Sequence, residues 1–155
     1  MLLFFSAGWC APCDQFLQVL KDFYSEVNLS EKVVEILYVS CDRDDQGFKE
    51  TYAKMPWISV LYNNPLHEKL KKKFEIIGVP VVLVCEAKTG FVISHKGRKD
   101  IFDHGVSCLK YWEDDMPAAK EKQQHLDEGE AVVRTQKEEA EAELMRKLQA
   151  EKDNE

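Results

Sequence analysis

Apolar runs and amphipathic segments alternate between residues 2 and 112. Residues 2–5 form a continuous apolar run, and residues 33–40 are dense in Val, Ile, Leu and Tyr. Both runs are typical of buried strands. Between them, apolar side chains recur at the spacing of a helix that packs by one face, at Phe16, Val19, Leu20, Phe23, Tyr24 and Val27. The pattern therefore predicts a right-handed strand–helix–strand unit.

The alternation continues in the following residues. Further helices are expected at residues 48–54, 66–74 and 100–112, and further strands at residues 79–85 and 91–95. Pro56 prevents the first of these helices from continuing, and residues 86–90 join the two strands as a hairpin. These elements predict an α/β fold in which helices cover both faces of a central sheet.

The composition changes at Pro117. Residues 117–155 contain no aromatic side chain and are rich in Glu, Lys, Gln and Ala, so we expect a domain at 1–116 and a charged, helical extension at 117–155. A thin apolar stripe runs through the extension at Leu126, Val133, Ala140, Leu144 and Leu148. Gly129 and Lys147 interrupt it, which favours a single solvated helix over a sustained coiled coil. A weak homodimer through this helix is the alternative.

Cys10 and Cys13 carry the most specific chemical signal, because a C-x-x-C between a strand and a helix is typical of redox proteins. Backbone N–H groups and the dipole at a helix start favour an anion, so the Cys10 thiolate should be stabilised. Cys13, one turn later, can attack a mixed disulfide on Cys10. Pro12 lies in the first turn, where its missing N–H costs little and its φ helps to set the helix start. Half of a zinc site is the alternative, but no second C-x-x-C or C-x-x-H follows.

The remaining cysteines indicate the cellular compartment, and the net charge disfavours one class of partner. Cys41, Cys85 and Cys108 stand singly in apolar surroundings and are expected to be reduced core residues, which favours a reducing compartment. No signal-peptide pattern or membrane-spanning run is evident, so we expect a cytoplasmic, or nuclear, protein with no membrane partner. The formal charge of −7 disfavours a general nucleic-acid binder.

Two segments resemble the tryparedoxin and nucleoredoxin branch of the thioredoxin superfamily. Residues 5–13, Phe-Ser-Ala-Gly-Trp-Cys-Ala-Pro-Cys, are similar to its active-site stretch, and residues 48–57 end in its Met-Pro-Trp signature. Further short segments are similar to the nucleoredoxin-like proteins, at residues 20–24, 96–99 and 105–108. The resemblance covers residues 2–112. It implies a thioredoxin-like fold, with a minimal, glutaredoxin-like core of a central mixed sheet flanked by helices.

The resemblance also implies positions around the two cysteines. Pro80 would be a cis-proline facing the C-x-x-C, turning the chain so that the backbone of Val79 can pair with an extended substrate beside Cys10. An ordinary trans-proline at a strand start is the alternative reading. Trp9 and Trp57 are predicted at the mouth of the site, where aromatic side chains can grip a peptide. For Trp57 a core position is equally compatible.

Two departures from the family pattern matter. Thioredoxins place a buried aspartate six residues before the first active-site cysteine, and here that position is Phe4. A bound water, or an acidic group of the loop 42–45, would then have to take the proton of Cys13. Secondly, the family branch has further N-terminal strands, so we expect an exposed sheet edge that can invite pairing.

Together the residues and the resemblance predict a protein thiol-disulfide oxidoreductase. It would mainly reduce disulfides, through a mixed disulfide at Cys10 that Cys13 resolves. We expect no bound cofactor, protein disulfides as substrates, and thioredoxin reductase or glutathione as the electron donor. The alternative is a redox-sensitive protein-binding regulator with weak turnover, which the nucleoredoxin resemblance also implies.

Overall fold

β1 lies at the centre of a five-stranded mixed sheet with the strand order β3-β2-β1-β4-β5 in the computed structural model, which describes residues 1–152. The strands are β1 (Leu2–Ser6), β2 (Ile36–Ser40), β3 (Ile58–Ser59), β4 (Val81–Cys85) and β5 (Val92–Ser94). β1 pairs in parallel with β2 and antiparallel with β4, and β5 pairs antiparallel with β4. The structure thus contains the central mixed sheet that the sequence predicts.

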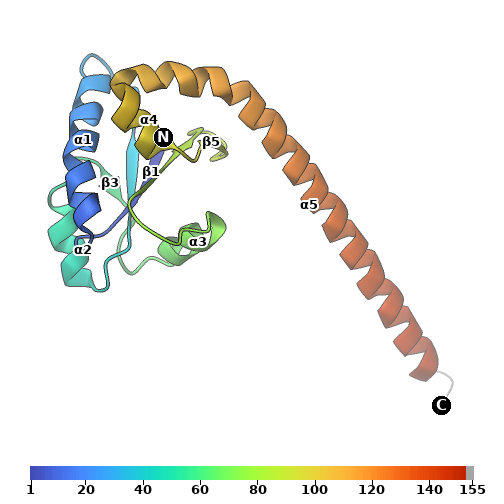
Figure 1. Cartoon of the computed structure of the whole chain (residues 1–155). Coiled ribbons are helices and arrows are strands. Elements are labelled where there is room, and N and C mark those ends of the chain that lie inside the picture. The colour runs from blue at the N-terminus through green and yellow to red at the C-terminus, as the bar shows by residue number, and fades with distance from the viewer. Residues whose placement is uncertain (153–155) are drawn as a thin grey trace. The chain divides into compact units, whose positions relative to one another are not determined.

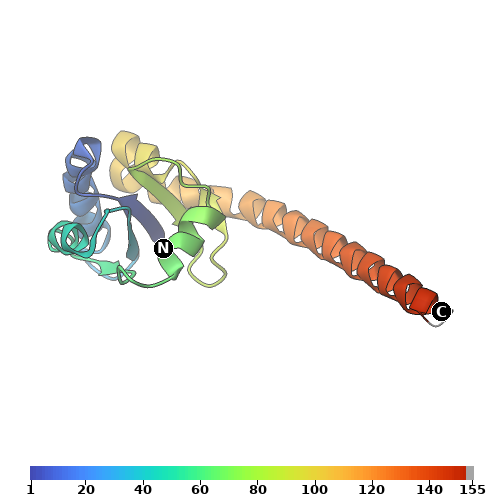
Figure 2. The ribbon, with the colours of Figure 1, turned by 90° about the horizontal axis from the view of Figure 1, so that it is seen from below.

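Helices flank this sheet on both sides (Figures 1 and 2). The α-helices of the described residues are α1 (Ala11–Val27), α2 (Asp45–Tyr52), α3 (Leu66–Lys73), α4 (Gly97–His104) and α5 (Cys108–Lys152), of which α5 extends into a second unit described below. Alternating strand residues face the two layers. Leu2 and Phe4 pack in one core cluster with the buried face of α1, whereas Leu3 and Phe5 belong to a second cluster, against which Leu70 of α3 packs. All five residues of β1 are buried, as a central strand requires.

The topology brings three loops to one edge of the sheet. β1 and β2 are parallel and in register, with Ser6 opposite Ser40, so both strands end at this edge. β4 runs the other way and pairs Val81 with Phe5, so it begins there. The loop after β1, the loop after β2 and the loop before β4 therefore lie together, and they contain most of the residues that the sequence singles out.

Three expectations about elements need correction. The sequence predicts an exposed edge of the sheet, but a short fifth strand, β3, pairs in parallel with β2 at its outer side. The helix expected at 100–112 is two helices, because Gly105 has a φ of 53° and ends α4 before a 3₁₀ turn at Gly105–Ser107. Finally, the next helix does not stop at Trp112. α5 continues through Pro117, which costs it one backbone hydrogen bond.

The chain divides into two units, Met1–Met116 and Pro117–Glu155. A long C-terminal helix is present, as predicted, and the side chains of Leu126, Val133 and Leu144 on it are exposed. Leu148 belongs to the predicted stripe, but its side chain lies outside the described residues. Pairing through this stripe stays a prediction. No helix within residues 1–152 is both long and apolar enough to cross a membrane.

Candidate redox site

Cys10 and Cys13 form a disulfide at the start of α1. Cys10 is the N-cap residue, with extended backbone angles (φ −103°, ψ 104°), and its Sγ accepts a hydrogen bond from the backbone N–H of Cys13 at 3.3 Å. A sulfur thus takes the capping place that an oxygen usually fills. Cys10 keeps 6% of its surface exposed against 2% for Cys13. A partner therefore reaches Cys10 more readily, in keeping with its predicted role as the nucleophile.

The loop before β4 lies against Cys10. The Val79–Pro80 peptide bond is cis, as the resemblance implies, and the carbonyl oxygen of Val79 is 3.6 Å from Cys10 Sγ. In the disulfide the sulfur carries no hydrogen, so this is a contact; a Cys10 thiol can donate to the same oxygen. Pro80 is buried and Val79 is half-buried. Pairing of the Val79 backbone with a substrate stays a prediction.

Trp9 lies at the rim of the site. Its side chain is 55% exposed, its Nε1 donates a hydrogen bond to the carbonyl oxygen of Cys41 at 3.1 Å, and the guanidinium of Arg43 lies 5.3 Å from its ring centroid. Anchoring at the indole nitrogen leaves the apolar ring open to solvent beside Cys10. An amphipathic ring held in this way suits contact with a peptide.

Trp57 lies in the core and not at the mouth of the site, so the structure contains the second of the two positions that the sequence left open. Its side chain is only 4% exposed, and its ring packs edge-on against Phe4 and Tyr24, at centroid distances of 6.1 and 5.4 Å. Nε1 of Trp57 has no hydrogen-bond partner in the part of the chain that the structure describes. Aromatic packing outweighs that cost, which places Trp57 in the core.

The structure shows the surroundings of Phe4, which replaces the buried aspartate of thioredoxins, and of the acidic residues after β2. Phe4 is fully buried among the rings of Phe16, Tyr38 and Trp57. In the loop, Asp44 caps α2 by accepting from the Gly47 N–H at 2.7 Å. Asp45 pairs with Lys49 at 2.5 Å. Proton acceptance by this loop stays a prediction.

Asp42 has a role that the sequence analysis missed. Its Oδ1 accepts from the backbone N–H of Gly8 at 2.8 Å, and its Oδ2 accepts from the hydroxyl groups of Tyr38 at 2.9 Å and Ser40 at 2.8 Å. Burial raises the pKa of the Tyr38 phenol far above its usual range, so the phenol stays a donor. The nearest signal in the sequence is the cluster of acidic residues, which does not indicate which carboxylate turns inward.

The three other cysteines are free thiols. Burial raises the pKa of the Cys85 thiol to about 11 and that of Cys108 to about 12. Burial also raises the pKa of Cys41, which is half-buried. These thiols stay protonated near neutral pH. No group of three or more His, Cys, Asp or Glu side chains among the described residues is arranged to hold a metal ion.

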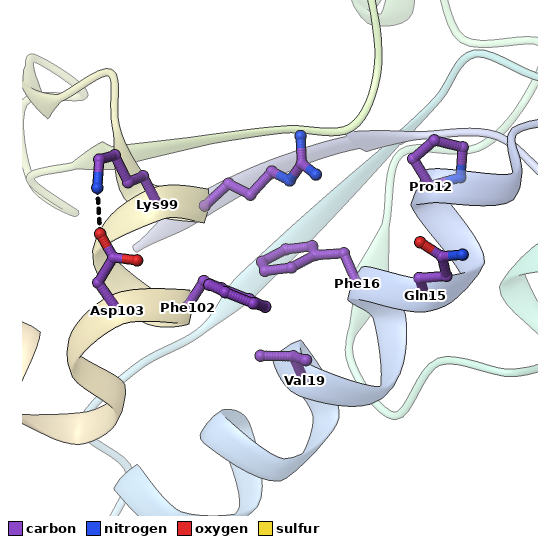
Figure 3. Close-up of a pocket in the computed structure, with 8 residues that line it drawn as sticks. Pro12, Gln15, Phe16, Val19, Lys99, Phe102 and Asp103 are labelled. Atoms are coloured by element: carbon purple, nitrogen blue, oxygen red, sulfur yellow. Dashed lines mark hydrogen bonds and ion pairs between the residues drawn. The ribbon is translucent and has the colours of Figure 1, made fainter.

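A cavity of about 310 Å³ opens between α1 and α4, next to Pro12 (Figure 3). Phe16, Val19 and Phe102 form its apolar lining, and Phe102 is 72% exposed. Lys99 and Asp103, which form an ion pair, stand on its α4 side. No local sequence pattern indicates this cavity, because its two walls belong to α1 and α4, which lie far apart in the chain.

A family model described as thioredoxin-like matches residues 1–92. The chain belongs to the thioredoxin-like family. It is 31% identical over 114 residues to probable nucleoredoxin 1 of Arabidopsis thaliana, a match that covers 74% of this chain and 20% of that protein. It is also 31% identical over 104 residues to the tryparedoxin of Trypanosoma brucei brucei, covering 66% of this chain and 72% of the relative.

Solved tryparedoxins share the fold. Tryparedoxin from Trypanosoma brucei superposes with a TM-score of 0.66 at 29% identity, covering 72% of this chain and 77% of that one. A structure of tryparedoxin II complexed with glutathionylspermidine gives a TM-score of 0.62 at 31% identity, covering 66% and 72%. The chain spans only about a fifth of the Arabidopsis nucleoredoxin, so it corresponds to a small part of that protein.

Proposed function

We propose that this thioredoxin-like chain is a protein thiol-disulfide oxidoreductase that acts mainly as a reductase. The observation that carries the proposal is the capping geometry at α1. The Cys13 N–H points at Cys10 Sγ at 3.3 Å, and the same hydrogen bond stabilises a Cys10 thiolate in the reduced protein. Membership of a family that includes tryparedoxin and nucleoredoxins supports redox chemistry at this pair.

The reaction balances as two thiol-disulfide exchanges. The Cys10 thiolate attacks one sulfur of a substrate disulfide, forms a mixed disulfide and releases the other sulfur as a thiolate. Cys13, after losing its proton, attacks Cys10 Sγ, forms the Cys10–Cys13 disulfide and releases the second substrate sulfur. The substrate gains two electrons, and the disulfide form of the chain is the oxidised product. Two molecules of glutathione, which leave as glutathione disulfide, or thioredoxin reductase return two electrons.

An insulin-reduction assay tests this function. The reduced full-length chain should cleave insulin disulfides, with thioredoxin reductase and with glutathione supplied in separate reactions as donors. Cys10→Ser should abolish turnover with either donor, while Cys85→Ser, a buried thiol away from the site, should retain it. Turnover that is unaffected by Cys10→Ser would refute the proposal.

A redox-sensitive protein-binding regulator is the second candidate, in keeping with the similarity to nucleoredoxins. The long charged helix favours it, because the exposed apolar side chains of this helix offer contacts to a partner protein. Comparing oxidised and reduced full-length chain in pull-downs separates the two candidates. Capture that changes with redox state but persists in Cys10→Ser would favour binding over catalysis.

A further inference from the structure

The loop after β2 holds the loop after β1 through three tethers. The Cys41 N–H donates to the carbonyl oxygen of Ser6 at 2.8 Å, the Gly8 N–H donates to Asp42 Oδ1 at 2.8 Å, and Trp9 Nε1 donates to the carbonyl oxygen of Cys41 at 3.1 Å. Gly8 and Trp9, which two of these hydrogen bonds hold, directly precede Cys10 in the chain. The position of the reactive sulfur is thus set partly by two residues more than 30 positions further along the chain.

Asp42 is the only side chain of the three tethers that acts as an acceptor, and it is saturated. Besides Gly8, Oδ1 accepts from the hydroxyl of Thr51 on α2 at 3.3 Å, and Oδ2 accepts from Tyr38 and Ser40. Two oxygens thus meet four donors. An ionised carboxylate can accept all of them, whereas an amide has one oxygen and would turn an NH₂ group toward donors. Charge-assisted bonds of this kind are also about twice as strong as neutral ones.

Gly8 packs so closely against the side chains of Thr51 and Asp42 that a Cβ atom does not fit between them. A Cβ built on Gly8 would lie 2.4 Å from Thr51 Oγ1 and 3.4 Å from Asp42 Oδ1. The backbone of the loop therefore rests directly on the side chains of Thr51 and Asp42. This close contact restricts movement of the loop toward Thr51, and the hydrogen bond to Asp42 fixes the orientation of the Gly8 N–H.

We propose that Asp42 is a positioning residue for the redox centre: its carboxylate clamps Gly8 and so holds Trp9 and Cys10 in the geometry that reacts. The role rests on the proposed oxidoreductase function and acts through the loop, without contact between Asp42 and the substrate. It differs from proton acceptance, because all four donors to the carboxylate are structural groups of the chain.

Asp42→Asn tests the clamp, with Asp45→Asn as the matched control. Each variant removes one negative charge from residues 42–45, but Asp45, the first residue of α2, forms an ion pair with the exposed Lys49 and with no other side chain for which the structure shows a contact within residues 1–152. With insulin as substrate, kcat/KM of Asp42→Asn should fall by about tenfold to a hundredfold, the cost expected when a reacting group is misplaced. The control should stay within about twofold of the wild type. Unchanged kcat/KM in Asp42→Asn would overturn the proposal.

Two readouts separate positioning from a general loss of fold. Amide hydrogen exchange at Gly8 should accelerate in Asp42→Asn, and alkylation of reduced Cys10 should slow across pH 6 to 9, while circular dichroism remains native. These readouts need no turnover, so they decide the clamp even if the wild-type chain fails to reduce insulin, which would refute the proposed function alone. Gly8 exchange at the wild-type rate in Asp42→Asn would overturn the clamp.

Single-donor variants cover the case in which Asp42→Asn does not fold. Tyr38→Phe and Thr51→Ala each leave the carboxylate with three donors, so each should lower the Cys10 alkylation rate by a smaller factor, about twofold to fivefold. If both variants alkylate as the wild type does, the clamp does not position Cys10.

Discussion

The backbone N–H of Cys13 donates a hydrogen bond to the Sγ of Cys10, 3.3 Å away, so Cys10 caps the helix with the same sulfur that Cys13 would later attack. One turn of α1 thereby couples the two steps of the proposed reaction. The N–H stabilises negative charge on Cys10, and the same turn keeps the Cα atoms 5.2 Å apart, within the range of a disulfide.

Alkylation of the reduced protein should follow the order that burial and the helix start impose. Iodoacetamide should label Cys10 first between pH 6 and 8, because the helix start favours its thiolate and Cys10 is less buried than Cys13. Burial raises the pKa of Cys85 to about 11 and of Cys108 to about 12, so both should react appreciably only as the pH approaches those values. Mass spectrometry of peptides labelled at each pH measures the order. Earlier labelling of Cys85 or Cys108 in the folded protein would contradict the assignment.

Trapping should distinguish the two active-site cysteines. Cys13→Ser keeps the attacking thiol but removes the resolving one, so it should accumulate mixed disulfides with protein substrates. Cys10→Ser should accumulate few, since Cys13 is only 2% exposed. Non-reducing gels of the two variants, incubated with the same oxidised protein mixture, give the comparison. Equal trapping by both variants would reverse or remove the assigned order.

The two tryptophans should separate function from stability. Trp57→Ala removes a buried side chain and should lower the free energy of unfolding by about 3–5 kcal/mol. Trp9→Ala removes an exposed ring and one hydrogen bond, so it should lower the free energy of unfolding by only about 0.5–1.5 kcal/mol, yet weaken reduction of insulin. Urea unfolding and turnover are measured on both variants. A small disulfide reagent serves as the control substrate for Trp9→Ala, because it offers no peptide to grip.

Gly8→Ala should disturb the active-site loop through one steric contact. The new Cβ would lie 2.4 Å from Thr51 Oγ1, closer than a Cβ contact permits. The variant should lose about 1–3 kcal/mol of unfolding free energy, as overpacked sites do. Combining it with Thr51→Ala removes the contacting oxygen and should restore part of the loss, so the double mutant should be more stable than Gly8→Ala alone. Strictly additive effects in thermal unfolding would place the cause elsewhere.

Truncation after Met116 should preserve redox turnover. All residues of the candidate site lie in the unit Met1–Met116, and the unit that starts at Pro117 contains no cysteine. The truncated chain should match the full chain in insulin reduction per mole, while any dimer seen in sedimentation velocity should disappear. Loss of turnover with a native circular dichroism spectrum would assign the C-terminal helix a part in the reaction.

The sequence by itself determined the features that depend on neighbouring residues. The C-x-x-C between an apolar run and an amphipathic segment predicts the strand, the helix start and the paired cysteines, because strand and helix periodicities act over a few residues. The long charged helix at the C-terminus is predictable for the same reason. Family resemblance added the cis bond before Pro80, which the structure contains.

Tertiary structure decided the features that join distant segments. Asp42 meets Gly8 across 34 positions, and the carbonyl of Val79 meets Cys10 across 69, so neither contact leaves a local pattern. Trp57 lies in the core because its ring packs against the rings of Phe4 and Tyr24. The residues next to Trp57 in the sequence do not indicate this packing. β3 has only two residues, too few for a period to show. The contact between Asp42 and Gly8 forms only because the parallel pairing of β1 and β2 brings the C-terminal ends of both strands to one edge of the sheet.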